Sequence, residues 1–344
     1  MRLQRILLIA FLSLAAFPAV AQDRGWTITG LDDDDFWAPH NHDQYYTHGI
    51  RFSATSGDVT EPLWDAPFTF IDGIVPIFPT APGMARRYNL IPIGQNMYTP
   101  RNRALFNPDP RDRPYAGWLY GGAGLMQDTP GESGAADRFD ELALKLGIVG
   151  PGSLANAVQT HYHLMIDVAP FRGWHAQLRN EPAVDLFYQH KWRFHDETAE
   201  GWGWDAIPQW DLRLGTVYDY AGLGGLLRIG RNLRVDYGPP HIDLNTGADY
   251  INPTRAASGN WSFYGLIGTE LRAVGHNIFL DGNDFTASAH VTKIPAVADL
   301  EAGLAIAYRH WRLAYTYVLR SPEFVHEAGP DHYGALNLTI HLPF

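Results

Sequence analysis

Four segments of this chain alternate apolar residues with charged or polar ones at every second position. They are Pro182–His195, Gln209–Tyr218, Trp311–Arg320 and Gly334–Phe344. A β-strand places successive side chains on opposite faces, so each segment would have one apolar and one polar face. Charges at every second position do not fit the core of a β-sandwich. They fit a barrel whose outer wall meets lipid and whose lumen holds water.

The alternation also predicts which way individual side chains point. In the last segment, Leu338 and Leu342 should face lipid, whereas Asn337 and Thr339 should face the lumen. In the second segment, the same rule places Tyr218 on the lipid-facing side.

Segments of this kind recur along the whole chain. The expected strands lie near residues 26–37, 45–56, 86–98, 114–127, 138–149, 183–195, 206–218, 219–231, 261–274, 297–308, 311–320 and 333–344. Their number is even, as single-chain outer-membrane barrels require. The sequence therefore predicts an all-β fold, an antiparallel outer-membrane β-barrel of about 12 strands with one short loop helix. It would be a single domain over residues 22–344.

The links between these strands differ in length. Short links such as residues 309–310 are typical of periplasmic turns. The longer Pro-, Gly- and Asp-rich stretches 57–85, 99–113 and 232–259 predict outer loops or rim structure.

Composition agrees with a barrel and argues against a helical membrane protein. The chain has 11 Trp and 17 Tyr residues, yet its mean hydropathy is only −0.20. A barrel hides its apolar band in alternation, while aromatic residues gather at the membrane interfaces. After residue 21, no segment approaches the roughly 18 apolar residues that a spanning helix needs. The chain ends in Phe344 on an alternating strand, which is similar to the recognition signal of bacterial outer-membrane barrels.

The first 21 residues have the pattern of a secretory signal peptide. Arg2 and Arg5 form a basic start, Ile6–Ala16 an apolar core, and Ala19–Ala21 a cleavage site. Export to the bacterial outer membrane is therefore expected. Without this peptide the chain has 24 basic and 37 acidic residues, and the net charge of −13 argues against a nucleic-acid partner. The absence of cysteine excludes disulfides and a thiol nucleophile.

One stretch interrupts the strands with a helical pattern. Ser153 is the expected N-cap of a helix that runs from residue 154 to about residue 166. Gln159, His163 and Asp167 are spaced by four residues, so they would lie on one face of this helix. An amide, an imidazole and a carboxylate in register favour a catalytic role. The alternative is a plug or loop helix whose polar face meets water.

Asp32–Asp35 is the most acidic point of the chain. Adjacent carboxylates are complemented by a hard cation such as calcium, which takes oxygen ligands in flexible geometry. A solvated acidic rim is the alternative. Residues 40–48 contain three histidines, for which rim hydration is favoured over a transition-metal site. Thr47 shares a strand face with Arg51 and Ser53, so it would point toward the lumen or the first strand.

The motifs that the chain lacks constrain its chemistry as a hydrolase. It has no Gly-x-Ser-x-Gly nucleophile elbow. It also has no serine in a His/Asn arrangement like that of the outer-membrane phospholipases. A hydrolase built from this chain would use an activated water, with histidine as general base and a metal ion as electrophile.

Short sequence blocks spread over nearly the whole chain occur in the order of a known family. They are Asp32-Asp33-Asp34-Asp35-Phe36, Tyr46-Thr47-His48-Gly49, Asp112-Arg113-Pro114-Tyr115-Ala116-Gly117-Trp118, Gly147-Ile148-Val149-Gly150-Pro151, Gln159-x-x-x-His163, Gly173-Trp174-x-x-Gln177-Leu178-x-Asn180-Glu181-Pro182, Arg228-Ile229-Gly230 and Ser321-Pro322-Glu323-Phe324. Together they resemble the outer-membrane lipid A 3′-O-deacylases.

This resemblance implies a twelve-stranded barrel that removes an ester-linked acyl chain from the 3′ position of lipid A in a calcium-dependent reaction. The family's site residues fall on Asp33, Asp34, Thr47, Gln159 and His163. His163 would take a proton from the attacking water. Calcium near Asp33 and Asp34 would stabilise the oxyanion. Thr47 and Gln159 would orient the ester, the cation or the imidazole.

Two positions depart from the family pattern. Asp33 stands where the family has asparagine, which adds a negative charge beside the expected cation. Ala169 stands where a characterised member has an acidic residue, six positions after the histidine. Asp167 is the candidate to take the place of that acid.

The expected partners are the outer membrane and lipid A or lipopolysaccharide in its outer leaflet, and the expected state is a monomer. Two alternatives stay open. One is a passive channel or structural barrel, which would leave lipid A unchanged. The other is a phospholipase, which would release fatty acid from glycerophospholipids.

Overall fold

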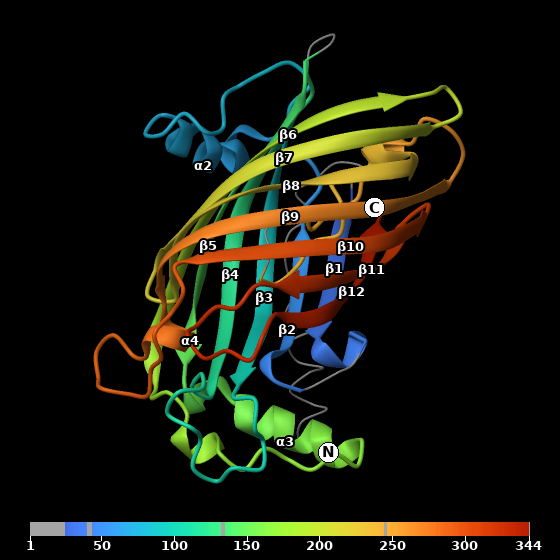
Figure 1. Cartoon of the computed structure of the whole chain (residues 1–344). Coiled ribbons are helices and arrows are strands. Elements are labelled where there is room, and N and C mark those ends of the chain that lie inside the picture. Colours follow the sequence, from blue (N-terminus) through green and yellow to red (C-terminus); the bar gives the residue numbers. More distant parts are fainter. Residues whose placement is uncertain (1–24, 40–42, 132–134, 244–245, 344) are drawn as a thin grey trace, which may run out of the picture.

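The computed structural model describes residues 25–39, 43–131, 135–243 and 246–343. Twelve strands form one closed antiparallel barrel (Figure 1). The strands are β1 (Trp26–Asp34), β2 (Tyr45–Thr55), β3 (Ala85–Thr99), β4 (Ala116–Thr129), β5 (Asp137–Val149), β6 (Glu181–Glu197), β7 (Trp202–Gly215), β8 (Tyr218–Arg231), β9 (Trp261–Asn277), β10 (Ala296–Tyr308), β11 (Trp311–Arg320) and β12 (Asp331–Leu342). The links contain the short helical segments η2 (Asp35–Trp37), α2 (Pro62–Asp72), η3 (Pro151–Ser153), α3 (Ala155–Met165), η4 (Trp174–Ala176), η5 (Leu233–Val235), η6 (Pro253–Arg255) and α4 (Ile278–Asp281). Within these described ranges, no helix has the length and apolar character needed to cross a membrane.

The barrel closes because its first and last strands pair. β1 pairs with β12 from Trp26 opposite Leu342 to Asp34 opposite Gly334, and it pairs with β2 on its other edge. Every strand therefore has two partners, and the sheet has no open edge. The predicted antiparallel barrel of twelve strands is confirmed. The expected signal peptide and the terminal Phe344 lie outside the described residues.

The wall separates an apolar outer face from a polar inner face. On β12, Leu338 and Leu342 are 48% and 41% exposed, whereas Asn337 and Thr339 are 2% and 0% exposed. The predicted orientation of these four residues is confirmed. The apolar side chains form the surface that lipid covers, as in other membrane barrels.

The alternation restarts where β7 turns into β8. β7 ends at Gly215 and β8 begins at Tyr218, so the single strand expected over residues 206–218 is in fact broken by a turn. The lipid-facing position expected for Tyr218 is wrong. Its ring is buried inside the barrel, and its hydroxyl lies 2.7 Å from the Tyr98 hydroxyl. Two turn residues separate the paired strands. As a result, the inward-facing residues have odd numbers on β7 and even numbers on β8.

The lumen is filled by the chain itself and is not a water-filled channel. The β8–β9 link folds back into the barrel, and three of its aspartates form buried ion pairs with arginines of the wall: Asp236 with Arg312, Asp243 with Arg320, and Asp249 with Arg51. The expectations of a wet lumen and of an outer loop at 232–259 are therefore wrong. The physical reason is that a buried charge needs a nearby counter-charge, and this interior link supplies it.

The links gather at two opposite ends of the barrel (Figure 1). The end that carries α3 also holds residues 99–113. Residues 57–85, which contain α2, lie at the other end together with the short 309–310 turn. Because antiparallel strands reverse direction at each link, 57–85 and 99–113 cannot share an end. Of the two expectations for 57–85, an outer loop at the same end as 99–113 is wrong, and rim structure is compatible with its position.

We expect Leu338→Arg to lower the free energy of unfolding in lipid vesicles by about 2–4 kcal/mol, because it places a charge on the lipid face. Urea midpoints measure this loss, and Leu338→Gln separates the charge from the change of shape. Asn337→Arg is not a mild comparison, because the Asn337 Oδ1 already accepts from the Arg312 guanidinium and a second cation would lie beside it. A loss from Leu338→Arg no larger than that from Leu338→Gln would contradict the orientation of β12.

Candidate active site

A cavity of about 1170 Å³ opens at the α3 end of the barrel. Its walls come from the end of β1, the start of β2, the β3–β4 link and α3. Asp34, Thr47, Gln159 and His163 all line it. The fold thus brings together four of the five residues predicted for the site from distant parts of the sequence.

The helix that closes this cavity begins differently from the prediction. Leu154, in the left-handed region at φ 62°, precedes the first turn of α3 and is its N-cap. The expected cap Ser153 lies within η3, where its hydroxyl donates to the Gly150 carbonyl at 2.6 Å. The Ser153 prediction is wrong by one residue, because the helix begins at Ala155; the Ser153 hydroxyl still accepts from the backbone N–H of Ala155 at 3.4 Å.

α3 turns its polar face toward the protein. Ala155, Gln159 and His163 are its buried residues. Leu164 and Met165 are exposed and do not line the cavity. The alternative of a loop helix whose polar face meets water does not fit this arrangement, because the amide and the imidazole are directed into the cavity.

Hydrogen bonding orients the imidazole of His163. Its Nδ1 lies 3.2 Å from the carbonyl oxygen of Ala169, which can only accept. Nδ1 is therefore the protonated nitrogen in the neutral ring, and Nε2 keeps its lone pair. Nε2 lies 3.5 Å from Oδ2 of Asp43, a carboxylate that also accepts from Arg103 at 3.0 Å.

The group that contacts Nδ1 of His163 lies at the position that departs from the family pattern. The backbone carbonyl of Ala169, at the departing position itself, orients the imidazole. Asp167 does not share the face of His163, because α3 ends at Met165 and Asp167 is exposed with φ 58°. The expectation that Asp167 continues the helical stripe is wrong.

Gln159 lines the cavity, and one hydrogen bond fixes the orientation of its amide. The indole Nε1–H of Trp174 donates to its Oε1 at 2.7 Å. Because an indole nitrogen can only donate, this bond settles which end of the amide faces Trp174. The opposite end, Nε2, is buried and has no hydrogen-bond partner among the described residues.

Five carboxylates border the cavity. Asp34, Asp35 and Asp43 come from the end of β1 and the β1–β2 link, and Asp109 and Asp112 come from the β3–β4 link. Burial raises the pKa of Asp35 well above its usual range, and the negative charges of Asp34 and Asp43 raise it further. Burial also raises the pKa of Asp43, although His163 and Arg103 oppose this. Such a group of oxygens needs protons or a cation to offset its charge, and hard oxygen ligands are what calcium takes.

The other predicted ligand lies elsewhere. Asp33 is fully buried on the inner side of the wall, where its Oδ2 accepts from the backbone N–H of Ile242 at 3.2 Å. It does not line the cavity. Asp32 and His48 form a separate group with Asp34, whose ligand atoms lie within 4.8 Å of one another. In this group the His48 Nε2 already lies 2.8 Å from the Asp32 carboxylate.

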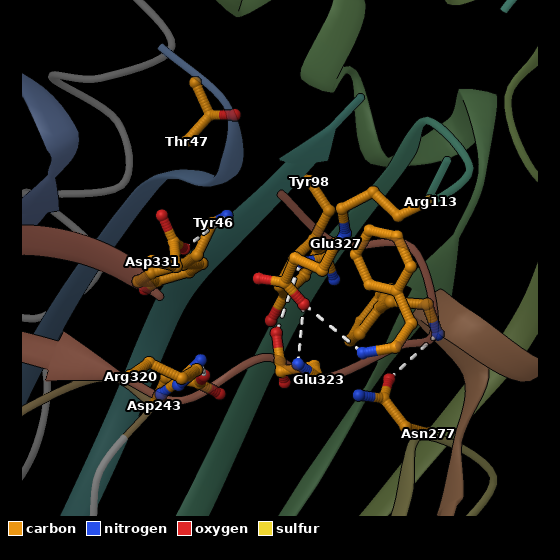
Figure 2. Close-up of polar contacts among 12 residues, drawn as sticks. Tyr46, Thr47, Tyr98, Arg113, Asp243, Asn277, Arg320, Glu323, Glu327 and Asp331 are labelled. Atoms are coloured by element: carbon orange, nitrogen blue, oxygen red, sulfur yellow. Dashed lines mark hydrogen bonds and ion pairs between the residues drawn. The ribbon is translucent and has the colours of Figure 1, made fainter. Parts of the chain in front are cut away.

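Thr47 lies on the β2 side of the cavity (Figure 2). It is buried, and its hydroxyl lies 2.5 Å from that of Thr99 on β3. Below it, the Asp331 carboxylate accepts from the backbone N–H of Tyr46 at 3.2 Å. β2 is thereby held to the start of β12, which keeps Thr47 in place.

A second cluster of polar residues lies near Tyr46 and Asp331 (Figure 2). Arg113 lies 3.3 Å from the Glu323 carboxylate. Glu327 accepts from the backbone N–H groups of Glu323 and Phe324. Burial and the neighbouring Glu323 charge raise the pKa of Glu327 to about 8. These contacts tie the β11–β12 link to the start of β4.

Asp43 is the residue that the sequence analysis did not single out. It belongs to the polar stretch at 40–48, for which only hydration was expected. Asp43 and Tyr45 both have positive φ, 48° and 63°, and both line the cavity. Strained backbone of this kind often marks a functional site. His40 and His42 of the same stretch lie outside the described residues.

Comparisons with known proteins agree with this architecture. A family model described as "Outer membrane protein LpxR" matches residues 6–342. The structure of LpxR from Salmonella typhimurium has a TM-score of 0.71 and 15% sequence identity, covering 92% of this chain and 100% of that one. The β-domain of the Bordetella autotransporter BrkA reaches a TM-score of only 0.44 at 11% identity, covering 94% of this chain and 100% of that one. No curated protein sequence matches. The Salmonella match supports the fold.

Proposed function

The chain belongs to the LpxR family of bacterial outer-membrane proteins, and on that premise we propose that it is a lipid A deacylase. In this proposal it hydrolyses the ester of the acyl chain at the 3′ position of lipid A. The observation that carries the proposal is the shared cavity, which is lined by the buried His163 imidazole, with Nε2 3.5 Å from the Asp43 carboxylate, by the Gln159 amide and by a group of carboxylates.

His163 acts as general base in this reaction. Its Nε2 accepts a proton from a water molecule while the water oxygen attacks the ester carbonyl carbon. The bond between that carbon and the sugar oxygen then breaks, and the imidazolium returns the proton to the leaving oxygen. Asp43, 3.5 Å from Nε2, stabilises the imidazolium in between. The Ala169 carbonyl keeps the ring in the required tautomer.

Gln159 and Thr47 position the ester. The amide Nε2 of Gln159 donates to the carbonyl oxygen as negative charge develops on it, a contribution that can be worth about 2.7–4 kcal/mol for one such donor. The Thr47 hydroxyl, paired with Thr99, orients the ester or its water from the opposite side.

We propose calcium as the cofactor, held by Asp34 with Asp35 and Asp43. Asp34 and Asp35 are buried, Asp43 is half-buried, and all three offer the hard oxygen ligands that calcium takes. When bound, calcium would supply charge stabilisation for the developing oxyanion. Asp33 adds a negative charge behind Asp34 without offering its carboxylate to the cavity.

Mass spectrometry of lipid A tests this function. Cells that express the chain should contain lipid A lacking the 3′ acyl chain, together with the released fatty acid, and cells without it should not. A passive channel would leave lipid A unchanged and conduct ions. The filled lumen disfavours conduction. A phospholipase would release fatty acid from glycerophospholipids, and finding that product alone would replace the proposal.

A further inference from the structure

The β2–β3 link packs on the outer face of the barrel wall. On β3, Asn89 points inward and donates to Asp249 of the interior link at 3.0 Å. Side chains alternate between the two faces of a strand, so Arg86 and Tyr88, at odd spacings from Asn89, point away from the lumen. These two outward residues are the ones that hold the link.

α2 is fastened to them by polar contacts. Arg86 donates to both oxygens of the Asp65 carboxylate at 2.8 Å. The Tyr88 hydroxyl donates to the Trp64 carbonyl at 2.6 Å. Figure 1 shows α2 outside the strands, at the end of the barrel opposite α3.

The link also covers polar groups that would otherwise meet lipid. Arg86 and Gln127 are both outward residues, yet they are only 2% and 0% exposed. Gln127 donates to the carbonyl of Pro79 at 2.8 Å, and the Arg86 guanidinium lies over the Phe68 ring. The polar contacts of the link are thus directed toward the wall.

Its remaining surface is apolar, the reverse of a helix that faces water. Within residues 61–84, the charged residues are Glu61, Asp65 and Asp72. Asp65 is paired with Arg86, and Asp72 accepts from the backbone N–H of Phe78. Four of its large apolar side chains are exposed: Leu63 at 77%, Phe70 at 68%, Ile74 at 66% and Val75 at 51%.

We propose that α2 and the residues up to Val75 form an interfacial membrane segment, whose apolar side inserts among phospholipid acyl chains in the leaflet opposite α3. The segment lies on a wall that is itself lipid-facing, so its apolar surface is continuous with an established lipid contact. The half-exposed Trp64 suits the interface, where indole rings gather. The assignment of this leaflet as the periplasmic one rests on the proposed function, which puts the cavity in the outer leaflet. The lipid contact itself does not.

The absence of cysteine makes a direct test simple. Phe70→Cys is labelled with an environment-sensitive fluorophore and reconstituted into phosphatidylcholine vesicles with or without lipids brominated on their acyl chains. Leu300→Cys, on the lipid face of β10, is the positive control, and Glu200→Cys, in the exposed turn at the same end as α2, is the aqueous control. Leu63→Cys serves as a second probe if Phe70→Cys does not fold, as judged by heat-modifiable mobility.

The label at residue 70 should be quenched by brominated lipid at least half as strongly as the label at residue 300, and little by aqueous iodide. Behaviour like that of residue 200 would overturn the proposal. Excimer formation by a pyrene label at residue 70 that rises with the protein-to-lipid ratio would also overturn it, in favour of a second copy of the chain. Because these measurements do not involve lipid A, failure of the deacylase proposal would leave their outcome unchanged.

Discussion

His163→Ala should lower the rate of lipid A deacylation by at least about 100-fold, because general-base catalysis typically contributes 10²–10⁴-fold. The substitution removes the nitrogen that accepts the proton of water and leaves the buried face of α3 otherwise intact. Release of fatty acid from purified lipid A in detergent micelles measures this rate. Heat-modifiable folding should be preserved, and calcium should still bind, because Asp34, Asp35 and Asp43 remain in place.

His161→Ala is the matched control. His161 lies two residues before His163 on the same helix and is exposed. Its Nδ1 lies 2.6 Å from the Ala157 carbonyl of the same helix. Its loss should change the rate little. If both variants deacylate lipid A like the parent chain, His163 is not the base, and α3 is a loop helix without a catalytic group.

Chelation of calcium should abolish deacylation, and added calcium should restore it. Asp34→Asn should raise the calcium concentration for half-maximal activity by about tenfold or more, in line with the usual cost of altering groups around a bound metal. Full activity after exhaustive chelation would remove the cation from the mechanism.

Asp33→Asn is the informative partner of that variant. The two residues are neighbours on β1, but only Asp34 lines the cavity. Asp33→Asn removes a charge behind the site and recreates the residue of the family, so it should need somewhat more calcium and keep a similar maximal rate. An effect as large as that of Asp34→Asn would mean that Asp33 binds the cation directly.

The wall of the barrel could be predicted because it obeys a local rule. Within each strand, apolar and polar residues alternate, as Leu338 and Asn337 do. The strands could therefore be recognised and counted without knowing which strands pair. The paths of the links have no such periodicity. Nothing in the spacing of residues 57–85 or 232–259 states that one lies outside the wall and the other inside it. A signal was present for the second, since inward arginines such as Arg312 and Arg320 require counter-charges.

The candidate site was predicted partly from family resemblance and partly from helical spacing. Spacing correctly placed Gln159 and His163 on one face, and it failed at Asp167 because the helix ends earlier. Strand alternation also indicates that Asp33 and Asp34 point to opposite faces of the barrel wall. The family resemblance alone does not distinguish the two residues. Asp43 could not be predicted, because it reaches His163 through a turn with positive φ and not through any regular element.

The pairing of β1 with β12 has a consequence for biogenesis. Asp34 lies opposite Gly334, Asp331 holds the start of β2, and Ala328 of the β11–β12 link borders the cavity while its N–H donates to the Tyr45 hydroxyl. The cavity is therefore assembled from both ends of the polypeptide. A nascent chain, or a half-inserted sheet, lacks part of this cavity until its last strand pairs with the first. On the proposed function, a chain would therefore gain activity only after its barrel has closed.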